Sequence, residues 1–100
     1  MSVRVEVQYT QGCPHAREFL ERVRQATAAV QARVELVEVL VEDATHAGGL
    51  RFRGSPTLLI NGKDLEGAPG IDGAGLGCRV YRGGLPSVES IRSAIHAATR

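Results

Sequence analysis

Hydrophobic residues follow two different periods in the first part of the chain. Over residues 3–9, apolar and polar side chains alternate, the pattern of a strand with one face on a core. After Gly12, apolar residues recur every three or four positions, which predicts an amphipathic helix. Its apolar stripe consists of Ala16, Phe19, Leu20, Val23, Ala26 and Val30.

The following segment is rich in β-branched residues and predicts a second strand over residues 34–41. Two strands joined by a helix of this length form a right-handed parallel β-α-β unit. Residues 42–47 allow a short helix or turn, which we expect the pair Gly48-Gly49 to close.

The second half of the chain predicts a hairpin and a final helix. A third strand is expected over residues 57–60, and Asn61-Gly62 is a strong hairpin signal, so an antiparallel fourth strand should follow over 63–65. Ser87 is a favourable N-cap, and the apolar spacing behind it predicts a helix that ends near Ala98. Residues 67–84 form a glycine-rich loop, and a loop this long in a small domain is usually functional or mobile.

These elements predict one α/β domain over residues 1–100. The expected order is β-α-β-(α)-β-β-α, with a four-stranded mixed sheet and helices on both faces. The net charge of +1, from 12 basic and 11 acidic residues, argues against a nucleic-acid or membrane-surface binder. We find neither a secretory leader nor an apolar run of about 18 residues, so a cytoplasmic location is expected. In a reducing compartment, two cysteines are more often catalytic, sensing or metal-binding than a structural disulfide.

The first cysteine lies where the first strand gives way to the helix, in the run Gly12-Cys13-Pro14-His15. The first backbone N–H groups of a helix lack internal partners, and the helix dipole adds positive charge there, so a thiolate is favoured. Pro14 suits the first turn of a helix, and a protonated His15 would favour the thiolate further. The alternative is that Cys13 is a small buried apolar residue.

The second motif is Gly54-Ser55-Pro56-Thr57, which leads into the third strand. A proline at the start of a strand cannot donate to the ladder and is a candidate for a cis peptide bond. Together with the Cys-Pro turn and the order of elements, this motif resembles the thioredoxin-like superfamily over essentially the whole chain. The resemblance implies a cis Pro56 beside Cys13 and a groove, formed with Pro14, Ser55 and Thr57, that docks an extended partner.

The chain departs from that family at Ala16, because typical members carry a second cysteine three positions after the first. Two mechanisms remain open for attack by the Cys13 thiolate on a disulfide or a peroxide. Either an external thiol such as glutathione resolves the mixed disulfide, or Cys78 does, because the resemblance implies that its loop approaches the helix tip. The alternative for Cys78 is a buried structural thiol. The resemblance implies a protein or a low-molecular-weight thiol or disulfide as partner and no cofactor; the sequence does not indicate an oligomeric state.

Three further functions compete with thiol–disulfide exchange. The motifs at residues 12–14, 52–57 and 77–82 resemble small bacterial thioredoxin-like proteins, some of which are called alkylmercury lyases. A lyase would need converging thiols and an acid, for which the candidates are Asp64, Glu66 and Asp72. Cys13, Cys78 and His15 would offer a set of soft-metal ligands for Hg²⁺, Cu⁺ or Zn²⁺. Finally, the chain would serve as a binding module without catalysis.

Overall fold

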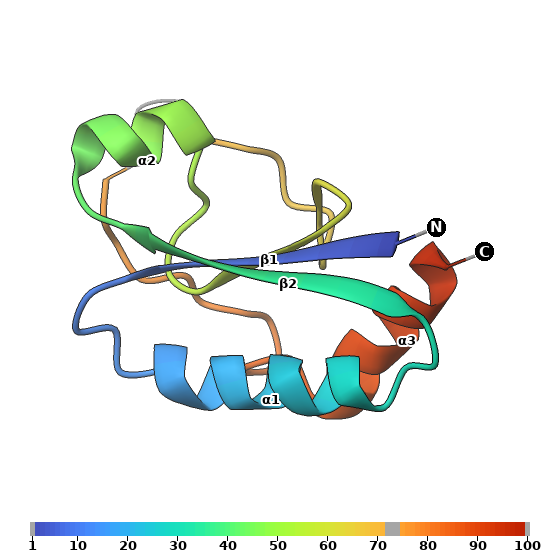
Figure 1. Ribbon diagram of the computed structural model, residues 1–100. Helices are drawn as coiled ribbons and strands as arrows, with labels where there is room; N and C mark the ends of the chain where they lie inside the picture. Colours follow the sequence, from blue (N-terminus) through green and yellow to red (C-terminus); the bar gives the residue numbers. More distant parts are fainter. Residues whose placement is uncertain (1, 72–74, 100) are drawn as a thin grey trace.

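The computed structural model describes residues 2–71 and 75–99 and shows an α/β fold with a four-stranded mixed sheet. Two helices, α1 (Ala16–Ala28) and α3 (Val88–Ala98), cover one face of the sheet, and the short helix α2 (Ala44–Leu50) lies on the other side (Figure 1). The sequence therefore predicts the α/β class and the order of the elements correctly.

The sheet is built around its first strand. The strands are β1 (Ser2–Thr10), β2 (Arg33–Val41), β3 (Thr57–Ile60) and β4 (Lys63–Asp64), in the spatial order β2-β1-β3-β4. β1 runs parallel to β2 and antiparallel to β3, and β3 runs antiparallel to β4. The antiparallel register places Gln8 opposite Thr57, so the end of β1 lies beside the start of β3. This arrangement brings the Cys13 turn and the Pro56 loop to the same end of the sheet.

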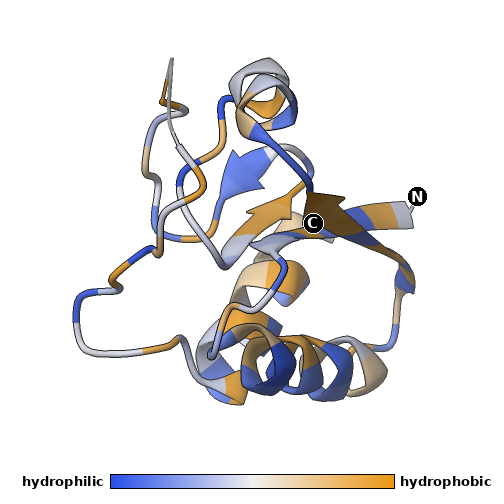
Figure 2. Cartoon of the chain, turned by 90° about the vertical axis from the view of Figure 1, so that its left-hand side faces the viewer, coloured by the Kyte–Doolittle hydropathy of each residue, from blue (hydrophilic) through white to orange (hydrophobic). Residues whose placement is uncertain are grey.

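The main core lies between the sheet and helices α1 and α3. Its inward strand residues are Val3, Val5, Val7, Leu58 and Ile60, and its inward helix residues are Phe19, Leu20, Val23, Ala26, Ile91 and Ile95. In Figure 2 the ribbon of both helices changes repeatedly between hydrophobic and hydrophilic colours, as expected of amphipathic helices. A smaller cluster of Val41, Ala47 and Phe52, with Leu50 packed against it, seats α2 on the other side.

The start of α1 and the end of α2 differ from the predictions. Helix α1 begins at Ala16 after the N-cap His15, so Pro14 lies in the preceding turn and not in the first helical turn. Gly48-Gly49 does not close α2: the helix continues to Leu50 because the Asp43 side chain caps it and its apolar residues pack. The helix is closed instead by Arg51, which adopts a left-handed φ of 51°.

The hairpin turn and the final helix agree with the sequence, whereas strand β4 is shorter than predicted. Asn61 and Gly62 have φ values of 51° and 82°, as a two-residue type I′ turn requires. Strand β4 is shorter than expected because the Asp64 carboxylate accepts hydrogen bonds from the backbone N–H groups of Glu66 and Ala68 and turns the chain. The Ser87 hydroxyl accepts a bond of 3.1 Å from the Ser90 N–H and caps α3.

The packing of α3 on the sheet can be tested at Ile91, whose side chain has no exposed surface. We expect Ile91→Ala to lower the free energy of unfolding by about 3 kcal/mol, because it removes buried methyl groups and leaves a cavity. Ser93→Ala on the exposed side of the same helix should change it by less than about 0.5 kcal/mol. Urea denaturation measures both values, and equal losses would contradict this placement of α3.

Candidate functional site

Cys13 lies in the turn between β1 and α1 and is half-buried. Its N–H donates to the Thr10 carbonyl over 3.3 Å, and its own carbonyl accepts from the Ala16 N–H over 3.3 Å. Gly12 makes the turn possible with a left-handed φ of 79°. The backbone therefore holds Cys13 from both sides, directly before the helix. His15, the N-cap of α1, is exposed, and its side chain makes no capping hydrogen bond.

A pocket of about 550 Å³ opens beside Cys13, between the end of β1, the start of α1 and the end of β2. Its apolar walls include Tyr9, Leu20 and Leu40, and Arg17 and Arg24 contribute cations. Arg24 is paired with Glu21 and Glu38, whereas Arg17 has no ion-pair partner in the parts of the chain that the structure describes. This size and mixed lining suit a small molecule.

The proline loop is attached to the end of β1. The Ser55–Pro56 peptide bond is cis. The Ser55 hydroxyl accepts a hydrogen bond of 3.0 Å from the Thr10 N–H, and the Thr57 hydroxyl donates to the Gly54 carbonyl over 2.6 Å. Ser55, Pro56 and Thr57 are all buried, so these predicted partner-contacting residues expose almost no surface.

Residues 77–81, which we call the docked segment, cover the proline loop. Cys78 forms a parallel bridge with Ser55: the Ser55 N–H donates to the Gly77 carbonyl over 3.0 Å, and the Arg79 N–H donates to the Ser55 carbonyl over 2.9 Å. Arg79 and Tyr81 are turned inward, whereas Cys78 is exposed and Val80 is 92% exposed. The interpretation of Cys78 as a buried structural thiol is therefore wrong.

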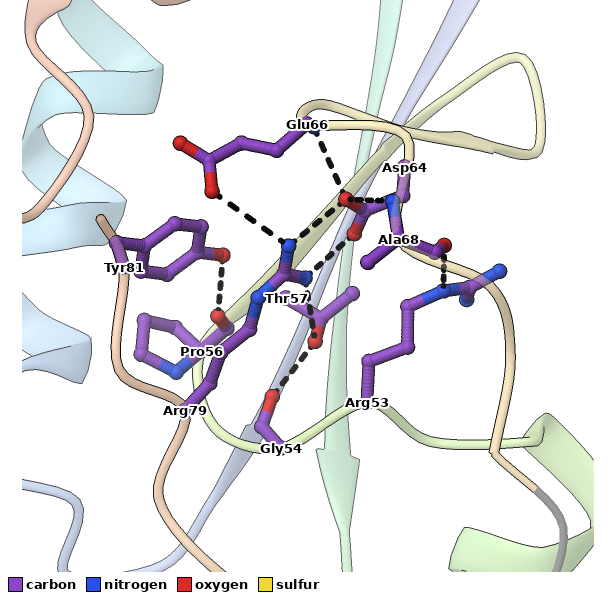
Figure 3. A network of polar contacts seen from close by, with 9 residues as sticks. All are labelled: Arg53, Gly54, Pro56, Thr57, Asp64, Glu66, Ala68, Arg79 and Tyr81. Carbon is purple, nitrogen blue, oxygen red and sulfur yellow. Dashed lines mark hydrogen bonds and ion pairs between the residues drawn. The ribbon is translucent and has the colours of Figure 1, made fainter.

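A buried ion pair fixes the docked segment (Figure 3). The Arg79 guanidinium donates to both carboxylate oxygens of Asp64, one of them over 2.8 Å, and the two side chains are only 9% and 1% exposed. The guanidinium also lies 4.4 Å from the centroid of the Tyr81 ring, a cation–π contact. The Tyr81 hydroxyl donates to the Pro56 carbonyl over 2.6 Å. Two alternate residues of the segment thus attach it to β4 and to the proline loop.

The electrostatics of this network keep the pair charged and the phenol neutral. Burial is the largest influence on the pKa of Asp64 and raises it, but the hydrogen bonds from Arg79 and from the Ala68 and Glu66 N–H groups outweigh burial, so the pKa lies below its usual value. The hydrogen bond to Asp64 raises the pKa of Arg79. Burial raises the pKa of Tyr81. Asp64 is therefore a carboxylate near neutral pH and is not suited to donate a proton.

The remaining predicted residues do not gather around Cys13. Glu66 is half-exposed and lies 4.0 Å from Arg79, and Asp72 lies outside the described residues. Within the described ranges, no group of three or more His, Cys, Asp or Glu side chains is arranged to hold a metal ion, so Cys13, His15 and Cys78 do not form such a set.

The two free cysteines are connected through Thr10 and Ser55. The Thr10 carbonyl binds the Cys13 N–H, the Thr10 N–H binds the Ser55 hydroxyl, and Ser55 is bridged to Cys78. Leu76, just before the docked segment, lines a second pocket together with Thr10. The docked segment therefore lies close to the end of β1, from which the Cys13 turn departs.

Sequence reasoning missed Arg79, Tyr81 and the role of Asp64 as their anchor. One pattern pointed to them: in residues 78–81, exposed Cys78 and Val80 alternate with inward Arg79 and Tyr81, the two-residue period of an extended segment. The pattern is too short, and too close to glycines, to be distinguished from a loop.

Comparisons with known proteins add no relative. No protein-family model matches the chain, and no curated protein has a significant match to its sequence. Among the described residues, no helix is both long and apolar enough to cross a membrane.

The ion pair predicts a large effect of Asp64→Asn on stability. This change leaves the buried Arg79 guanidinium without its counter-charge, so we expect the free energy of unfolding to fall by about 3 kcal/mol. The matched control is Glu66→Gln. The Glu66 side chain is 41% exposed, and its carboxylate lies 4.0 Å from the same guanidinium, a long and weak contact. We therefore expect Glu66→Gln to change the free energy of unfolding by less than about 0.5 kcal/mol. Chemical denaturation measures both, and a larger effect of the control would contradict the assignment.

The same pair predicts a pH dependence of a defined sign. The folded pKa of Asp64 is lowered, so its contribution is complete above the unfolded value of about 3.9 and is lost as the pH falls through the folded pKa. The difference in unfolding free energy between the natural chain and Asp64→Asn should therefore be constant near pH 6–7 and shrink below about pH 4. A difference that grows on acidification would show that Asp64 is not held as a carboxylate.

Proposed function

We propose that the chain is a thiol–disulfide oxidoreductase of the thioredoxin-like class, with Cys13 as its nucleophile. The observation that carries the proposal is the place of Cys13: a half-buried thiol in the turn before α1, on the wall of a pocket of about 550 Å³. The cis Ser55–Pro56 bond and the β-α-β-α-β-β-α order support the assignment to this class.

Helix α1 supports a thiolate at Cys13. The helix is 13 residues long, and its N-terminal end, which carries partial positive charge, begins three positions after Cys13. The neighbouring His15 is exposed and, when protonated, adds a positive charge near the thiolate. Among the described residues, no acidic side chain lines the pocket to oppose this charge.

The proposed reaction has two exchange steps. The Cys13 thiolate attacks one sulfur of a disulfide RS–SR′, so that a Cys13–SR bond forms, the S–S bond of the substrate breaks, and R′S⁻ leaves and takes up a proton. A second thiolate then attacks the Cys13–SR disulfide. If this thiolate is Cys78, it attacks the Cys13 sulfur and releases RS⁻, and the chain is oxidised to a Cys13–Cys78 disulfide, which requires the two Cα atoms within about 7 Å. If it is an external thiolate R″S⁻, it attacks the R sulfur, so that RS–SR″ forms and the Cys13 thiolate leaves.

The competing functions have less support. A carbon–mercury lyase needs an acid, and Asp64 is held as a carboxylate by Arg79. Soft-metal binding by Cys13, His15 and Cys78 lacks a converging set of ligands among the described residues. A peptide-binding role for the proline loop is opposed by the docked segment, which already uses both backbone groups of Ser55.

Single-cysteine variants test the proposal. Cys78→Ser leaves Cys13 alone and Cys13→Ser leaves Cys78 alone, so the two thiols can be compared at one pH with iodoacetamide. We expect Cys13 at pH 6 to be alkylated at least about ten-fold faster than Cys78, because only the thiolate reacts. The decisive control is the Cys78→Ser variant unfolded in urea. If folding does not accelerate alkylation of Cys13, Cys13 is not an activated nucleophile.

Mass measurement after treatment with glutathione disulfide then separates the two resolving steps. The Cys78→Ser variant should keep a glutathione adduct on Cys13. In the natural chain, an intramolecular loss of two hydrogens selects Cys78 as the resolving thiol, whereas a persistent adduct selects an external thiol. A chain that takes up no glutathione and loses no hydrogens contradicts the exchange mechanism.

A further inference from the structure

We propose that the docked segment occupies, within the chain itself, the backbone edge where an extended polypeptide would pair, so that Cys13 exchanges with low-molecular-weight disulfides and not with polypeptide disulfides. This inference rests on the proposed function of Cys13 and names its class of substrate.

The backbone edge at the proline loop is already used. An extended peptide binds a sheet edge through main-chain hydrogen bonds to free N–H and C=O groups. At Ser55, both groups are bonded to the docked segment, the N–H to Gly77 over 3.0 Å and the carbonyl to Arg79 over 2.9 Å. A second strand therefore finds no free pairing group on Ser55.

Side chains prevent the docked segment from leaving easily. Arg79 is bonded to Asp64 and packed on the Tyr81 ring, and Tyr81 is bonded to the Pro56 carbonyl (Figure 3). A peptide that displaced the segment would replace two main-chain bonds but would expose a buried ion pair. Gly54 shows how closely the segment approaches, because a Cβ atom there would lie 2.9 Å from the Arg79 Cβ.

The pocket beside Cys13 offers a small molecule an open approach to the thiol. Its volume of about 550 Å³ lies within the range of small-molecule sites, about 300–1,000 Å³. The apolar side chains of Leu20 and Leu40 offer contact for the body of a ligand, and Arg17 offers a positive charge. A small disulfide with an anionic group matches this lining.

The test compares two probes in the Cys78→Ser variant, where only Cys13 reacts. The first probe is glutathione disulfide, and the second is a disulfide between two unstructured peptides of about ten residues. Mass spectrometry of quenched samples gives the rate at which each forms an adduct on Cys13. We expect glutathione disulfide to react at least about ten-fold faster, since it needs only a small-molecule site and not the backbone edge that the docked segment occupies.

A loosened segment should change this ratio. Tyr81→Phe, added to Cys78→Ser, removes the hydrogen bond to the Pro56 carbonyl but keeps the ring under Arg79. We expect the peptide rate to rise several-fold, while the glutathione disulfide rate stays within about two-fold. Ser93→Ala, an exposed change on α3 that lies in neither the pocket nor the docked segment, is the matched control and should leave both rates unchanged.

The outcomes separate this inference from the proposed function. Equal rates for the two probes in the Cys78→Ser variant would overturn the inference while leaving Cys13 as the nucleophile; no reaction with either probe would overturn the proposed function. Hydrogen exchange on the natural chain provides a second measurement that needs no variant. The backbone N–H groups of Ser55 and Arg79 should exchange slowly with solvent, both in the chain alone and after addition of the peptide probe in its reduced form. Rapid exchange of these two groups would overturn the inference.

Discussion

The buried ion pair between Asp64 and Arg79 anchors the docked segment, which lies between β4 and α3. Removing two charges from water is costly unless they pair closely and their remaining hydrogen-bonding capacity is used. Here Arg79 bonds both oxygens of Asp64, and the backbone N–H groups of Glu66 and Ala68 bond one of them as well. The described residues between β4 and α3 place only Tyr81 and Pro86 fully in the interior, so apolar burial alone anchors this segment weakly. The ion pair supplies the constraint that the core does not.

The second constraint is the topology of β1. Because β1 lies between a parallel and an antiparallel neighbour, its C-terminal end meets both the end of β2 and the start of β3. The turn that carries Cys13 leaves from this end, the pocket beside it extends to Leu40 of β2, and Ser55 approaches from the side of β3. The hydrogen bond from the Thr10 N–H to the Ser55 hydroxyl connects the two halves of the site.

Periodicity in the sequence was sufficient for the elements but not for the contacts between distant segments. The alternation over β1, the stripe of α1 and the Asn61-Gly62 turn are local patterns, and each predicted its element correctly. Gly48-Gly49 misled the prediction of α2, because capping by Asp43 and packing on Val41 outweighed the low helix propensity of glycine. The Cys13 turn was predicted from local residues too. The docked segment was not, because its anchor pairs Arg79 with a carboxylate 15 residues earlier, and no local pattern encodes that pairing.

Burial of Ser55, Pro56 and Thr57 connects the fold to the proposed class of substrate. A peptide that replaced the docked segment at Ser55 would only re-form the two main-chain hydrogen bonds that the segment gives up, so these bonds bring no net gain. It would also have to separate Arg79 from Asp64, which removes charged hydrogen bonds worth about 1.5–3 kcal/mol each. The balance favours the chain's own segment, even before the ordering of a flexible peptide is considered. The interactions that complete the sheet therefore also close one side of the thiol site, and the pocket next to α1 remains as the way to Cys13.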